Sequence, residues 1–164
     1  MRNMFNRAVD CEFIETNSLV KVKIKKVKNT ETSIYSKQEI FEILELLQNE
    51  DIIDKTIFSL LITTGMRKCE LLGLHLEDIN LLDGTITILR NLNWNKFEHK
   101  YYEVSPKTQG SYRSIPIPGN MVEILEVYLN VRTNIVKNNK ILFINKKGKR
   151  IGFDYLKHRW NKFI

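Results

Sequence analysis

The stretch that decides the fold of this chain is Thr64-Gly65-Met66-Arg67-Lys68-Cys69-Glu70-Leu71-Leu72-Gly73-Leu74. It follows an apolar helical run, residues 57–63, and Gly65 is the residue type that most readily ends a helix in a left-handed conformation. Helical spacing then resumes, so Arg67 is expected at a sharp break between two buried helices. There its planar guanidinium could bind a phosphate. In the alternative interpretation, Arg67 only caps a helix or pairs with Glu70.

The distribution of charge favours a polyanionic partner. The 164 residues carry a formal net charge of +7, and the pI is near 9.4. Residues 137–164 hold nine Lys or Arg against one acid, Asp154, whereas the remainder is close to neutral. A second basic cluster could follow DNA phosphates or simply be a solvated linker; it consists of Lys21, Lys23, Lys25, Lys26 and Lys28.

The composition excludes several classes of protein. Hydrophobic residues make up 43% of the chain, which is enough for a real core, but no apolar run approaches the roughly 20 residues that span a bilayer. Cys11 and Cys69 are interpreted as reduced thiols of a cytoplasmic protein. His75 and His99 have no ligand partners at metal-binding spacing, and no Gly-rich phosphate loop is present, so neither a metal nor a nucleotide cofactor is predicted.

The first half of the chain is predicted to be mainly helical. Residues 1–15 have one apolar helical face, and residues 20–25 alternate as an extended linker or edge strand. Ser36 and Glu39 have the spacing of a capping box. They open a helix that runs to Leu47, followed by a helix over 52–64 and a short helix that begins near Arg67.

The second half is predicted to contain the strands, so the fold class is α+β. Three antiparallel strands are expected over 85–89, 101–104 and 112–117, with 91–100 as a loop or wide turn. Asn120 is expected to cap a helix over 121–136. A short buried strand over 141–143 and a final helix from Phe153 complete the order.

The box around Arg67, continued by Glu77-Asp78-Ile79-Asn80, resembles the first conserved box of the tyrosine recombinases, the phage integrase family. A second stretch, residues 105–116, resembles that family's hairpin, which carries a lysine at its tip. The resemblance implies that Arg67 clamps the scissile phosphate and that Lys107 protonates the leaving 5′ oxygen. Further basic residues are expected to contact DNA: Lys68, Lys157, Arg159 and Lys162. Arg113 is expected to contact a phosphate or a nearby acid. Glu70 lies one helical turn from Arg67 and could orient its guanidinium or form an ordinary surface pair with it.

The same resemblance implies a domain division and a partner. Residues 1–16 would be the last helix of an N-terminal core-binding domain, 17–32 a basic linker, and 33–164 the N-terminal part of a mostly helical catalytic domain. The expected partner is double-stranded DNA at attachment sites in a bacterial host, bound by a tetramer of the complete protein. No cofactor is implied.

Two further elements of family chemistry are not found in the sequence. His158-Arg159-Trp160-Asn161 lacks the arginine that a His-x-x-Arg box requires, and none of the six tyrosines follows such a box. We therefore expect a chain that ends before the box and the nucleophilic tyrosine, binds DNA, and is inactive alone. The alternative is a non-catalytic, prophage-derived protein that binds DNA or a partner protein through its basic C-terminal segment.

Overall fold

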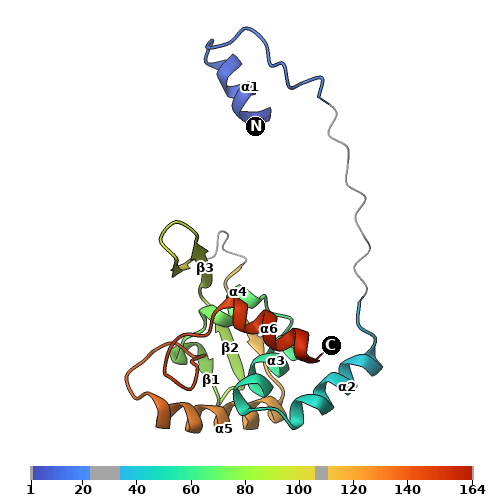
Figure 1. Ribbon diagram of the computed structural model, residues 1–164, viewed down its shortest axis with the longest axis vertical. Helices are drawn as coiled ribbons and strands as arrows, with labels where there is room; N and C mark the ends of the chain where they lie inside the picture. The colour runs from blue at the N-terminus through green and yellow to red at the C-terminus, as the bar shows by residue number, and fades with distance from the viewer. Residues whose placement is uncertain (1, 23–33, 106–110, 164) are drawn as a thin grey trace. The chain divides into compact units, whose positions relative to one another are not determined.

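The computed structural model describes residues 2–22, 34–105 and 111–163, which fall into two compact units, Met1–Ile34 and Tyr35–Ile164. Figure 1 traces the chain from the N-terminal helix to the C-terminal helix. Lys107 and the lysines at 23, 25, 26 and 28 lie outside the described residues. Within the described ranges, no helix is long and apolar enough to cross a membrane.

The described part of the N-terminal unit consists of helix α1 (Arg2–Asp10) and a turn region. The prediction of a helix over 1–15 was too long, because the chain reverses at Glu12, whose φ is +58°. The described part of the predicted extended stretch, Val20–Val22, lies in turns that are closed by backbone hydrogen bonds to Asn17 and Leu19. The Arg2 guanidinium donates to the carbonyls of Leu19, Val20 and Val22.

Three helices open the C-terminal unit: α2 (Lys37–Gln48), α3 (Ile52–Thr64) and α4 (Lys68–Gly73). The predicted capping box is present, because the Glu39 amide donates to Ser36 Oγ and the Ser36 amide donates to Glu39 Oε2. Helix α3 is buried over most of its length, which explains why its apolar residues are not confined to one face. Gly65 ends α3 with φ +62°, as the sequence predicts.

Within the described residues the strands form two sheets, so the prediction of one three-stranded sheet with a strand at 101–104 was wrong in its membership. The three-stranded antiparallel sheet has the order β1 (Ile79–Asn80), β2 (Thr85–Ile88), β5 (Arg113–Pro116). The short 3-10 helix η1 (Leu76–Asp78) leads into β1. Strands β3 (Asn91–Asn95) and β4 (Lys100–Val104) form a separate antiparallel hairpin, where a loop was expected over 91–100.

Helices α5 (Gly119–Ile135) and α6 (Phe153–Phe163) complete the C-terminal unit. In Figure 1, α5 runs along one edge of this unit and α6 lies beside α4 and α3. Helix α6 packs through Trp160 and Phe163 on the ring of Phe58 in α3. The helix α5 begins at Gly119 after Pro118, so Asn120 is not its cap. Residues 141–143 contribute an isolated bridge from Ile141 to His75 instead of a strand.

Candidate active site and nucleic-acid interface

Arg67 stands at the turn between α3 and α4. The left-handed Gly65 lets the chain reverse, and Met66, which is 4% exposed, anchors the turn in the core. Arg67 itself has extended backbone angles immediately before the first residue of α4. Its side chain is 75% exposed, so a fixed backbone presents a guanidinium that solvent can reach.

The carboxylate of Glu70 joins Arg67 to the sheet. Glu70 is 3% exposed and accepts from the Arg67 backbone amide at 2.7 Å and from Arg67 Nη1 at 3.0 Å. Arg113 on β5 donates to the two oxygens of the same carboxylate at 2.8 and 3.1 Å. Glu70 and Arg67 therefore do not form an ordinary surface pair, because the Glu70 carboxylate is buried and binds two guanidinium groups.

These contacts hold Glu70 in its ionised form. The Arg113 hydrogen bonds are the largest effect; burial opposes ionisation, but the backbone amide and guanidinium of Arg67 add to the stabilisation. Together they lower the pKa of Glu70 from 4.5 to about 2. Because Glu70 shares its negative charge between two guanidinium groups, the exposed face of Arg67 remains available to a second anion.

Arg67 and Glu70 line a pocket of about 390 Å³. Its other lining residues come from α4, from the β3–β4 hairpin and from the chain before β5: Cys69, Asn91, Asn93, Val104, Ser105 and Ser111. Lys107 is outside the described residues, but Ser105 and Ser111, which flank residues 106–110, both line this pocket. The pocket therefore combines the Arg67 guanidinium and its Glu70 partner with amide and hydroxyl side chains that can donate hydrogen bonds.

Two lining residues, Asn91 and Asn93, are not predicted from sequence, because the pattern over 91–100 indicates a loop or wide turn. The signal was present in the sequence, since Asn91-Leu92-Asn93-Trp94-Asn95 alternates polar and apolar residues as a strand does. In the structure Leu92 is 1% exposed, which leaves Asn91 and Asn93 on the other face of β3.

The other predicted DNA-contacting lysines lie elsewhere. Lys68 and Lys157 line a different groove of about 470 Å³, whose floor is aromatic and aliphatic. The Lys68 ammonium lies 5.7 Å from the centre of the Phe153 ring. Lys162, near the end of α6, is exposed. The structure thus does not bring Lys68, Lys157 or Lys162 to the lining of the Arg67 pocket.

Arg159, also predicted to contact DNA, is bound to acidic side chains of α3 and of the turn before it. Its Nε donates to Asp54 Oδ2 at 2.6 Å, and its Nη2 donates to Glu50 at 2.8 Å. Tyr155 donates to the other oxygen of Asp54 at 2.7 Å. Asp54 is 1% exposed, so these bonds fasten α6 to the start of α3. The guanidinium is neutralised by the acids that it binds.

The C-terminal unit of the chain matches a known protein family. The sequence model described as "Phage integrase family" matches residues 34–164. The chain belongs to the phage integrase family. Among curated relatives, this integrase-family chain is 31% identical over 144 residues to the tyrosine recombinase XerC-like protein of Caldanaerobacter subterraneus subsp. tengcongensis. It is 23% identical over 126 residues to the ICEBs1 integrase of Bacillus subtilis.

These matches cover only part of each relative. They span 79% of this chain but 36% of the XerC-like protein, and 77% of this chain but 34% of the ICEBs1 integrase. Among solved structures, the Tn1549 transposon integrase in complex with a circular intermediate DNA superimposes with a TM-score of 0.77 at 20% identity. That match covers 98% of this chain and 56% of the Tn1549 chain, and it supports the mixed helical fold with small antiparallel sheets.

Proposed function

We propose that this integrase-family chain binds double-stranded DNA and supplies the first arginine, Arg67, and the lysine, Lys107, of a tyrosine recombinase active site. The observation that carries the proposal is the exposed Arg67 guanidinium, oriented by the buried Glu70 carboxylate at the mouth of a pocket. A guanidinium that is pre-oriented in this way can stabilise the charge that develops on a phosphate under attack. Glu70 would be a positioning residue that contacts Arg67 and not DNA.

The chemistry proposed for the complete recombinase follows from these groups. A tyrosine attacks a backbone phosphate, Arg67 and a second arginine stabilise the pentacoordinate transition state, and the Lys107 ammonium protonates the departing 5′ oxygen. The energy of the broken phosphodiester bond is kept in the phosphotyrosine linkage. No His-x-x-Arg sequence occurs in the 164 residues, so we propose that this chain alone does not cleave DNA.

Several finer points belong to the same proposal. The recombinases that resemble this chain include the Tn1549 integrase in complex with transposon right-end DNA and XerH bound to its difH substrate, which supports DNA as the partner here. We propose attachment-site DNA, a tetramer of the complete protein and action in the cytoplasm of a bacterial host. We also keep the domain division at 1–16, 17–32 and 33–164 as a proposal.

Binding of a fluorescently labelled duplex of random sequence tests the role of Arg67. Arg67→Ala should weaken binding at low salt and reduce the slope of log affinity against log salt by about 0.9, because one phosphate contact is lost. Lys37→Ala is the matched control, since it removes the same charge from an exposed site on α2. Equal losses of affinity in the two variants would show that Arg67 contributes only general charge.

A nicked attachment-site substrate tests the prediction of inactivity. Incubation with this chain should yield no covalent protein–DNA adduct on a denaturing gel, with an intact tyrosine recombinase as the positive control. An adduct that forms and disappears when one tyrosine is replaced by Phe would contradict the prediction and identify the nucleophile.

A non-catalytic DNA- or partner-binding role is favoured by one observation. Seven lysines of the C-terminal segment are exposed, namely Lys137, Lys140, Lys146, Lys147, Lys149, Lys157 and Lys162. If this segment alone carries DNA binding, Lys147→Ala with Lys149→Ala should weaken affinity while Arg67→Ala leaves it unchanged. The active-site proposal predicts that Arg67→Ala also weakens it.

A further inference from the structure

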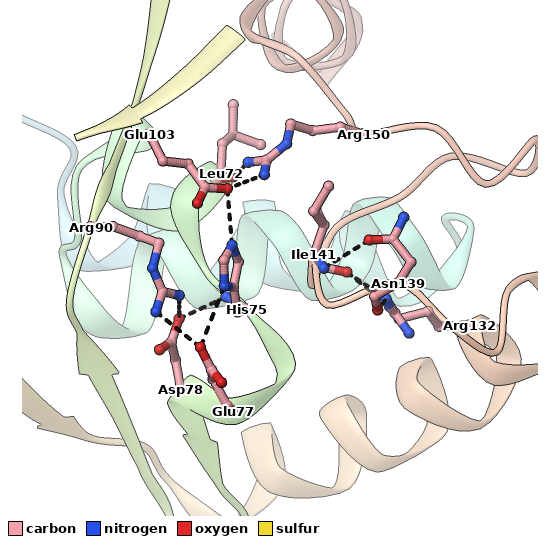
Figure 2. Close-up of polar contacts among 10 residues, drawn as sticks. All are labelled: Leu72, His75, Glu77, Asp78, Arg90, Glu103, Arg132, Asn139, Ile141 and Arg150. Atoms are coloured by element: carbon pink, nitrogen blue, oxygen red, sulfur yellow. Dashed lines mark hydrogen bonds and ion pairs between the residues drawn. The ribbon is translucent and has the colours of Figure 1, made fainter. Parts of the chain in front are cut away.

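A cluster of charged side chains lies where η1, β4 and the loop before α6 meet, and the proposed chemistry does not use it. His75 is at the centre of the cluster, with its side chain 2% exposed. Its Nε2 lies 2.9 Å from Oε1 of Glu103 on β4, and Arg150 donates to the same carboxylate oxygen. Figure 2 shows the imidazole and the Arg150 guanidinium converging on Glu103 from different elements.

His75 is fixed in the core through its backbone. Its amide donates to Asp78 Oδ2 at 2.7 Å. The adjoining residues pair with the segment 140–142, because the Leu76 amide donates to the Lys140 carbonyl and the Leu142 amide donates to the Leu74 carbonyl, both at 2.9 Å. These backbone hydrogen bonds hold His75 in place, so its imidazole donates to Glu103 from a fixed position.

The segment that pairs with the backbone around His75 is itself held by a buried arginine. Arg132 on α5 is 2% exposed, and its guanidinium donates to the carbonyls of Asn139, Ile141 and Leu142. Figure 2 shows this arginine reaching from α5 to the loop. Since no carboxylate is among these partners, Arg132 acts as a donor that satisfies backbone carbonyls.

Arg150 connects Glu103 to the helix that follows Arg67. Its Nη1 donates to the Leu72 carbonyl near the end of α4 at 2.9 Å, and its other terminal nitrogen donates to Glu103. Burial opposes ionisation of Glu103, but the hydrogen bonds from His75 and Arg150 outweigh it and keep the pKa of Glu103 below its usual value. Glu103 is thus a charged acceptor shared by two donors of the core.

This attachment matters because an isolated two-stranded hairpin is only marginally stable in water. Tyr101 and Glu103 are two residues apart on β4 and therefore point to the same side of the strand. The Tyr101 hydroxyl accepts from the Phe153 amide at 3.2 Å, and Glu103 makes the next attachment along the strand. The following residues, Val104 and Ser105, form part of the lining of the Arg67 pocket.

We propose that His75, Glu103 and Arg150 are positioning residues that hold the Val104–Ser105 wall of the Arg67 pocket against α4 and thereby set the affinity of this pocket for DNA phosphate. The inference rests on the proposed function of Arg67. Other charged groups near the imidazole are not part of this proposal. Glu77 Oε1 lies 3.5 Å from His75 Nδ1. Arg90 pairs with Glu77 and Asp78.

A double-mutant cycle on DNA binding tests the positioning role. His75→Leu, which removes the donor, and Glu103→Ala, which removes the acceptor, should each weaken binding of the labelled duplex by about twofold or more in the presence of Arg67. In an Arg67→Ala background the same substitutions should have clearly smaller effects. His75→Gln should bind like the unaltered chain, because its amide can donate from about the position of the imidazole Nε2.

The possible outcomes separate the two proposals. If Arg67→Ala weakens binding and the effects of His75→Leu and Glu103→Ala are independent of Arg67, the positioning role is overturned and the proposed function stands. If Arg67→Ala itself leaves affinity unchanged, the proposed function fails and the positioning role fails with it. If His75→Leu does not fold, Glu103→Ala serves as the test. The Glu103 side chain is 27% exposed, so its removal is expected to leave the chain folded.

Discussion

Replacement of Glu70 by Gln should remove a large, pH-dependent part of the stability of the C-terminal unit. The Glu70 carboxylate is buried and bound by Arg67 and Arg113, and its pKa is about 2 instead of 4.5. At about 1.4 kcal/mol for each pH unit, this difference corresponds to about 3 kcal/mol of folding free energy. Glu70→Gln should therefore lower the free energy of unfolding at pH 7 by about 3 kcal/mol.

The sign of the pH dependence follows from the lowered pKa. The stabilisation by ionised Glu70 is fully present above pH 4.5 and is lost as the pH falls through about 2. Urea unfolding at a series of pH values, followed by circular dichroism, measures it as the difference between the unaltered chain and Glu70→Gln. This difference in unfolding free energy should shrink toward acid pH. Other carboxylates titrate in both proteins, so their contributions cancel in the difference.

Glu126→Gln is the control for this prediction, because Glu126 is exposed on α5. Its unfolding free energy should stay within about 0.5 kcal/mol of the unaltered chain at every pH. If Glu70→Gln also changes stability by no more than this at pH 7, the two guanidinium contacts do not stabilise the fold and the argument for a pre-oriented Arg67 fails.

Three further substitutions and one control test the architecture of the C-terminal unit. Gly65→Ala should lower the free energy of unfolding by roughly 1 kcal/mol through its left-handed backbone alone, since a Cβ there meets nothing within 4 Å. Gly119→Ala is the control, because a Cβ there also meets nothing within 4 Å but the backbone φ is not positive. It should leave the free energy of unfolding unchanged in the same urea titration. Gly73→Ala should lower the melting temperature, because its Cβ would lie 3.0 Å from the Arg90 carbonyl oxygen and push β3 from α4. Arg132→Met should lower the free energy of unfolding by about 3 kcal/mol, because the carbonyls of Ile141 and Leu142 lose the Arg132 donors. An unchanged midpoint of urea unfolding would contradict this prediction.

The parts of the fold that sequence predicted well depend on neighbours within one helical turn. The Ser36–Glu39 capping box, the end of α3 at Gly65 and the final helix from Phe153 are all present. In each case the physical cause lies in adjacent residues: a side chain that accepts from a backbone amide three residues on, a missing Cβ, or apolar periodicity. Such causes can be read without knowledge of the rest of the chain.

The sheet was predicted less well because strand partners are distant in sequence. Strand β1 has only two residues and pairs with β2, while Lys100–Val104 pairs with Asn91–Asn95 and not with β2 or β5. Alternation identifies a strand but does not choose its partner. The side of α4 on which β3 packs depends on Gly73, whose missing side chain admits the backbone of Arg90 and Leu92.

The position of Arg67 at a turn between two helices could be predicted from sequence alone, because the glycine turn, the arginine and Glu70 interact over a few residues. Tertiary structure decided which basic side chains remain available to an anion. Arg113 reaches Glu70 across 43 residues, and Arg159 reaches Glu50 across 109. A charge count treats every Lys and Arg alike, but the folded chain distinguishes them. Arg113 and Arg159 each direct two guanidinium nitrogens at carboxylates, whereas Arg67 directs only Nη1 at Glu70 and its side chain stays 75% exposed.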